Sequence, residues 1–272
     1  MPDPRHDRTM PPVPDTTSRP AGIPAHRELS AADRRRRSAV TQRFGALDPV
    51  CLEALADGRG RVFQRLELMG DSVLEVVLHA HSVLAGPSCR VCAGRADLFT
   101  TNAHLQQLAR RAELGGWLDW HPSSSRLGDL VEACTGALFV NGRWPRVIGF
   151  VDAELHPIPP DERRRILHGG AQVHPDAPAR CREILGAAIL EAAASTSAYL
   201  RHPELDEGQL SRIKARMLSG EHILGRCRDS RWVRRRLRTR HFVRDDVERL
   251  LAEDLLAHGL ASAVSIAWPL VT

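Results

Sequence analysis

Three acidic residues recur at every fourth position in a stretch that is otherwise mostly apolar, RLELMGDSVLE at residues 65–75. Glu67, Asp71 and Glu75 therefore share one face of the helix that the apolar spacing predicts. Like charges four residues apart repel each other and destabilise a helix. A core helix with such a row needs a compensating cation, so the stretch is a candidate cation-binding site.

A second acidic pair lies in the segment GDLVEACTGALFVNG at residues 128–142. Its two acids are three positions apart and point to one side of their own helix. If the two helices pack side by side, four carboxylates converge. Hard divalent cations such as Mg²⁺, with Mn²⁺ as an alternative, take oxygen ligands, and two such ions can hydrolyse a phosphodiester. The alternative is two pairs of solvated surface acids, but the apolar flanks favour a metal centre. The predicted ligands are Glu67, Asp71, Asp129 and Glu132.

Helical periodicity runs from about residue 28 onward and strand alternation is absent over any useful length, which predicts an all-α fold. The pattern predicts helices over 28–44 and 62–85. It also predicts a short helix capped by Asp48 and stopped at Gly58, one capped by Thr101 or Asn102, and one that ends at Asn141–Gly142.

The three prolines within residues 157–160 predict a domain boundary, because proline breaks a helix. The chain then divides into an N-terminal half, residues 29–156, and a C-terminal half, residues 161–272. Residues 1–28 are rich in Pro and Arg, hold little to bury and are predicted to be a disordered tail.

The C-terminal half repeats the N-terminal half at an offset of 116 residues. CREILGAAILE at 181–191 aligns with RLELMGDSVLE, with Ala187 where the first copy has Asp71. The second acidic pair aligns at the same offset, which predicts duplication of one all-α unit. Because one oxygen ligand is missing, the second site is predicted to be degenerate. It consists of Glu183, Ala187, Asp245 and Glu248.

The formal net charge is +5 and the basic residues are nearly all arginine, with Lys214 as the only lysine. The planar guanidinium group of arginine can bind two phosphate oxygens at once, which favours a nucleic-acid partner. A composition bias of the source organism would give the same excess of arginine over lysine. The run RCRDSRWVRRRLRTRHF at 226–242 is a candidate RNA-contact segment, the alternative being a solvated helix face. The residues predicted to contact RNA are Arg231, Arg234, Arg235, Arg236 and Arg238.

The N-terminus lacks the apolar stretch of a secretion signal, and we expect a cytoplasmic protein with reduced thiols and no membrane span. Most of the six cysteines sit in apolar helical patterns, as small core residues do. Cys89 and Cys92 have zinc-knuckle spacing without a second pair to complete a site.

The two acidic motifs, together with TTNAHLQQLARRAELGGWL at 100–118, resemble the ribonuclease III family over about residues 45–155. The resemblance implies an all-α, dimeric, Mg²⁺-dependent endonuclease that cleaves double-stranded RNA and leaves 5′-phosphate ends. It also implies that the four acids of the N-terminal half bind the metal. The C-terminal half resembles the same family through HPELDEGQLSRIKARMLSGEHILGRC at 202–227, and Glu207 matches a further family acid that the N-terminal half lacks.

Two family-like units in one chain imply an intramolecular pseudo-dimer with one intact site that nicks a single strand. RNA affinity would come from the catalytic surface, from a further homo-oligomer or from a partner, because the chain ends at Thr272 without a separate RNA-binding domain. The alternative function is a catalytically inactive RNA-binding or assembly protein on the same scaffold. A third reading is a pure protein-interaction module.

Overall fold

The computed structural model describes residues 30–85, 101–114, 124–171, 179–237 and 241–272, and every regular element in these ranges is helical. The all-α prediction is therefore confirmed. The predicted tail, Cys89, Cys92 and Arg238 lie outside the described residues. The elements are α1 (Ala31–Phe44), α2 (Pro49–Asp57), α3 (Arg61–Ala85), α5 (Asn102–Arg111), α6 (Ser124–Phe150), a π-helical turn (Val151–Leu155), α7 (Pro160–His168), α8 (Ala179–Arg201), α9 (Glu207–Met217), α10 (Gly220–Asp229), α11 (Arg231–Arg236), α12 (Arg244–His258) and α13 (Leu260–Val271).

Helices α3 and α6 form the centre of the N-terminal half and approach each other closely where glycines cross. A Cβ atom on Gly70 would lie 1.8 Å from the carbonyl oxygen of Glu132, and one on Gly136 would lie 2.1 Å from that of Leu66. Any side chain at these positions would push the helices apart. The two glycines therefore bring the acidic faces of α3 and α6 together.

The same crossing recurs in the C-terminal half between α8 and α12. A Cβ atom on Gly186 would lie 1.9 Å from the carbonyl oxygen of Glu248. Gly186 and Glu248 stand 116 positions after Gly70 and Glu132, the offset of the sequence repeat. The aligned segments thus occupy corresponding places in two similar helix pairs.

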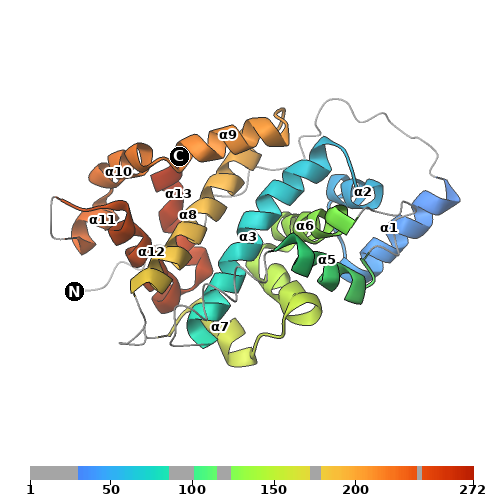
Figure 1. Cartoon of the computed structure of the whole chain (residues 1–272), viewed down its shortest axis with the longest axis horizontal. Coiled ribbons are helices and arrows are strands. Elements are labelled where there is room, and N and C mark those ends of the chain that lie inside the picture. The colour runs from blue at the N-terminus through green and yellow to red at the C-terminus, as the bar shows by residue number, and fades with distance from the viewer. Residues whose placement is uncertain (1–29, 86–100, 115–123, 172–178, 238–240) are drawn as a thin grey trace, which may run out of the picture.

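The two helix pairs pack against each other through α3 and α8, which lie side by side in the middle of the molecule (Figure 1). The contact between α3 and α8 is buried, and the hydroxyl oxygens of Ser72 and Ser195 are 2.7 Å apart within it. Helix α7 follows the predicted proline boundary and contacts α3 as well as α12 and α13. Helix α7, at the start of the C-terminal half, is therefore packed against helices of both halves.

Local capping follows the sequence prediction in most places and fails at one. The Asp48 side chain accepts from the backbone N–H of Val50 at 2.8 Å, and α2 ends at Gly58 with φ of 63°. Thr101 caps α5. The predicted end of α6 at Asn141–Gly142 is wrong, because the helix continues to Phe150.

The α6 extension has a physical cause on both sides of the predicted stop. The Asn141 side chain donates to the carbonyl of Ala137 at 2.7 Å, one turn earlier on the helix, so it does not redirect the chain. Beyond it, Trp144, Val147 and Ile148 are buried in the core. Tertiary packing overrides the local stop signal.

Helix α3 has 25 residues and a mean hydropathy of 1.2 over its most apolar window, so length and composition alone would let it cross a membrane. Within the structure, 61% of that window is buried. Most of this apolar window is thus packed inside the protein.

Candidate metal centre

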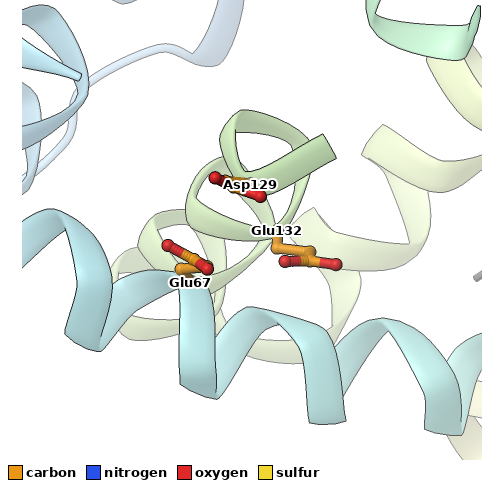
Figure 2. Close-up of side chains that lie close together, drawn as sticks. All are labelled: Glu67, Asp129 and Glu132. Atoms are coloured by element: carbon orange, nitrogen blue, oxygen red, sulfur yellow. The ribbon is translucent and has the colours of Figure 1, made fainter. Parts of the chain in front are cut away.

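Three of the four predicted ligands meet between α3 and α6. Glu67 projects from α3, and Asp129 and Glu132 project from α6 (Figure 2). One carboxylate oxygen from each residue lies within 4.8 Å of the others, and among the described residues no other trio of metal-binding side chains does so. We call these three residues the carboxylate cluster. An oxygen-only set at this spacing fits a hard divalent cation.

Burial and mutual repulsion raise the pKa values of the cluster. The pKa of Glu132 rises to about 9, because burial disfavours the charged form and because Asp71, Glu67 and Asp129 add negative charge around it. The pKa of Glu67 rises to about 7, first from burial and then from Asp129 and Glu207. Burial also raises the pKa of Asp129. A divalent cation would remove the repulsion and return all three carboxyls to the charged form.

Asp71 lies next to the cluster but outside the mutual 4.8 Å group. Its negative charge contributes to the raised pKa values of both Glu67 and Glu132. Its own pKa is raised by burial, while Lys214 of α9 opposes that shift. Lys214 also pairs with Glu191 of α8, with Nζ 2.8 Å from Oε1. The only lysine of the chain therefore partly balances the fourth predicted ligand.

The C-terminal half also contributes an acid to this centre. Glu207, the first residue of α9, is close enough to Glu67 to raise its pKa. Its Oε1 accepts from the hydroxyl of Ser211 at 3.3 Å, one turn further on, which restrains the side chain. The centre is therefore bordered by side chains from both halves of the chain.

Arginines pair with the acids at the corresponding positions of the C-terminal half. Glu183 accepts from Arg249 at 2.9 Å and from Arg180 at 3.4 Å. Glu248 accepts from Nε of Arg244 at 2.6 Å. Burial raises the pKa of Glu248 and the Arg244 hydrogen bond lowers it. These carboxylates already have fixed positive partners inside the chain.

Three of the four predicted degenerate residues line one cavity. Glu183, Ala187 and Glu248 line a cavity of about 330 Å³ between α3 and α8, which Glu75 and His79 line from the α3 side. The fourth residue, Asp245, is exposed in the first turn of α12 and is not part of that lining. The second site thus lacks one acid by substitution, and Asp245, although exposed, still adds negative charge near Glu248.

Restoring the missing carboxylate with Ala187→Asp is expected to leave the number of bound divalent ions per chain unchanged. A metal would have to displace Arg244 and Arg249 from Glu248 and Glu183, and both hydrogen bonds involve two charged groups. Isothermal titration with Mn²⁺ measures the stoichiometry directly. A doubled stoichiometry in the variant would show that the arginine pairs do not block the site.

Four of the five predicted RNA-contact arginines lie on or at the ends of α11. Arg231, Arg234, Arg235 and Arg236 are exposed, and the helix is anchored by Val233, which is fully buried. The Arg236 guanidinium lies 5.9 Å from the centre of the Trp232 ring. Helix α11 therefore exposes four arginine guanidinium groups to solvent, while Val233 packs it against the protein.

Sequence reasoning identified the acids of the cluster but not the partners that reach them from the other half. Lys214 and Glu207 come from α9, more than 130 positions after Glu67. The sequence did mark both residues, one as the only lysine and the other as an extra family-like acid. No local pattern placed either one beside α3.

Comparisons with known proteins support the fold and leave the activity open. No protein-family model matches the sequence, and no curated protein matches it. Among solved structures, the chain is similar to Dicer from Giardia intestinalis, a ribonuclease III family member, with a TM-score of 0.58 and 13% identity. The match covers 76% of this chain and 54% of Dicer, so the chain spans about half of the Dicer length. The chain has a fold distantly like that of ribonuclease III proteins.

Proposed function

We propose that this chain is a divalent-metal-dependent endoribonuclease that acts on double-stranded or structured RNA through one centre, in its N-terminal half. The observation that carries the proposal is the convergence of Glu67, Asp129 and Glu132, whose pKa values are raised together. Nucleases of this chemistry need several carboxylates around Mg²⁺ or Mn²⁺. The fold likeness to Dicer agrees with the proposal.

In this proposal, the carboxylate cluster would hold the metal and Asp71 would complete the set from the side. Bound Mg²⁺ supplies activation of a water molecule and stabilisation of the leaving oxygen. The residues of the chain orient that chemistry. Glu207 adds negative charge near Glu67, and the positive charge of Lys214 favours the ionised form of Asp71.

The two halves would form an intramolecular pseudo-dimer, which the paired crossings at Gly70 and Gly186 and the α3–α8 contact support. Only the N-terminal half would cut. The Arg249 and Arg244 pairs support a non-catalytic role for the C-terminal half, which would hold the duplex and supply Glu207.

The second candidate function is an inactive RNA-binding or assembly protein, and the arginine-filled second site favours it. The two functions separate when labelled duplex RNA is incubated with the full chain in Mg²⁺ and in chelator and then run on a denaturing gel. Cleavage in Mg²⁺ alone supports the nuclease. A duplex that shifts on a native gel and stays uncut in Mg²⁺ supports the inactive binding protein.

Replacing Arg234, Arg235 and Arg236 together by Gln is expected to weaken duplex binding and reduce its salt dependence. Each lost phosphate contact lowers the slope of log affinity against log salt by about 0.9. A duplex is contacted through phosphates and 2′-hydroxyls, so the loss should be similar for unrelated sequences. Fluorescence anisotropy over a salt series measures the slope.

The matched control for net charge is the triple variant Arg35→Gln, Arg164→Gln and Arg165→Gln on α1 and α7, where all three side chains are also exposed. If the control changes the slope as much as the α11 variant does, overall charge and not α11 governs binding. In that case α11 is a solvated face.

A further inference from the structure

A buried arginine of α3 reaches across the boundary between the halves and closes the end of α8. Arg65 is only 5% exposed. Its Nη1 donates to the carbonyl oxygens of His202 at 2.6 Å and Leu205 at 2.9 Å, and its Nη2 donates to that of Tyr199 at 2.7 Å. The last carbonyls of a helix lack partners and carry partial negative charge. A single guanidinium group therefore provides hydrogen-bond donors for backbone carbonyls at the end of α8 and in the turn that follows.

A second arginine of the same helix holds the same turn. Arg61, one helical turn before Arg65, donates from Nη1 to the carbonyl oxygen of Glu204 at 2.8 Å. The turn leads directly into α9, which begins with a capping box at Asp206. The first residue after that cap is Glu207. The position of the turn therefore sets the position of Glu207.

We call the four hydrogen bonds from Arg61 and Arg65 to the turn the clamp. The clamp arginines and the proposed metal ligand Glu67 belong to one helix. Arg65 is two positions before Glu67 on α3, so the same rigid backbone carries both. All four clamp bonds go to backbone carbonyls, which stay in place whatever the side chains of the turn are. The turn before Glu207 is thus held to the helix that carries Glu67 by arginine side chains that bond backbone carbonyls of the C-terminal half.

We propose that Arg65, supported by Arg61, is a positioning residue that holds Glu207 of α9 beside Glu67 of the carboxylate cluster, where α3 and α9 are in contact. The centre of the N-terminal half is then completed by a residue of the C-terminal half, held in register by this clamp. The role in cleavage rests on the proposed function, whereas the clamp itself does not.

Arg65→Lys is expected to loosen the turn without unfolding the chain. A lysine keeps the charge but cannot make three bonds from a planar fork. Hydrogen exchange of backbone amides in peptides that cover 202–211 should become about tenfold faster, while exchange in α12 should stay as in the wild type. Thermal melts identify any general loss of stability.

The same variant is expected to lower the cleavage rate constant roughly tenfold with little change in KM, because a small misplacement at a reactive centre lowers rate more than binding. The effect should disappear when Glu207 is already replaced by Gln. If Arg65 acts through Glu207, the double variant Arg65→Lys with Glu207→Gln cleaves as slowly as Glu207→Gln alone.

The matched control is Arg146→Lys. Arg146 also bonds backbone carbonyls, those of Phe44 and Ala46, but entirely within the N-terminal half. It should leave exchange in 202–211 unchanged. Unchanged exchange in Arg65→Lys, or additive rate losses in the double variant, would overturn the proposal. If the wild-type chain cuts no RNA while exchange in 202–211 still responds, the clamp stands and the proposed function fails.

Discussion

Glu132→Gln is expected to reduce Mg²⁺-dependent cleavage of duplex RNA by about 10³-fold or more, since a ligand of the metal is lost and metal ions supply several kcal/mol of transition-state stabilisation. The same substitution is expected to stabilise the metal-free protein. The pKa of Glu132 is about 9 in the fold, so near neutral pH the folded chain retains a proton that the unfolded chain has lost. Glutamine removes that imbalance, which is worth on the order of 1–3 kcal/mol at pH 7. Cleavage assays and thermal melts in chelator measure both effects.

The matched control is Glu248→Gln, 116 positions later in the chain. Glu248 accepts from Arg244, and the loss of that hydrogen bond opposes the relief of burying its carboxylate, so its replacement should change stability less than Glu132→Gln does and leave cleavage intact. A clear stabilisation in Glu132→Gln alone is the signature of one metal centre and one internally neutralised site. Equal loss of cleavage in both variants would contradict that division.

The stabilisation that Mg²⁺ gives the folded chain is expected to grow as pH rises. Both Glu67 and Glu132 have pKa values raised in the metal-free fold, to about 7 and about 9. Their unfolded forms titrate near pH 4.5, so the contribution of these two groups to metal-free stability is most favourable below that pH and falls as pH rises toward 9. Metal binding requires the charged forms, so affinity rises over the same window.

Once Mg²⁺ is saturating, the free energy of unfolding rises by about 1.4 kcal/mol for each tenfold rise in the affinity for Mg²⁺. Melts in millimolar Mg²⁺ and in chelator, taken from about pH 6 to about pH 9, measure it. The gain should be weaker and flatter in Glu132→Gln and unchanged in Glu248→Gln. A constant gain across the range in the wild type would mean that Mg²⁺ binds elsewhere.

The all-α fold and the meeting of the three acids of the carboxylate cluster were largely predictable because their signals are local. Apolar periodicity located α3, Asp48 and Gly58 bounded α2, and the spacing of the acids put them on facing helix sides. The end of α6 was not predictable, since Asn141 and Gly142 carry a stop signal that only the buried residues beyond them override.

Contacts between neighbours on one helix were predictable from spacing, whereas contacts between different helices were not. Arg180 and Arg244 precede Glu183 and Glu248 by three and four positions, so those pairs are visible in the sequence as helix neighbours. Arg249 reaches Glu183 from another helix. The same is true of Arg65 and Lys214, whose partners depend on how α3, α8 and α9 pack.

The central claim is that one chain holds one cutting centre, and a duplex with a different label on each strand tests it most directly. The full chain is mixed with the duplex at one chain per duplex in Mg²⁺, and the products are resolved on native and denaturing gels. We expect each event to cut one strand, so nicked duplexes accumulate before any double-stranded break, and chelator stops the reaction. Paired cuts in both strands from the earliest times, or an intact duplex in Mg²⁺, would contradict it.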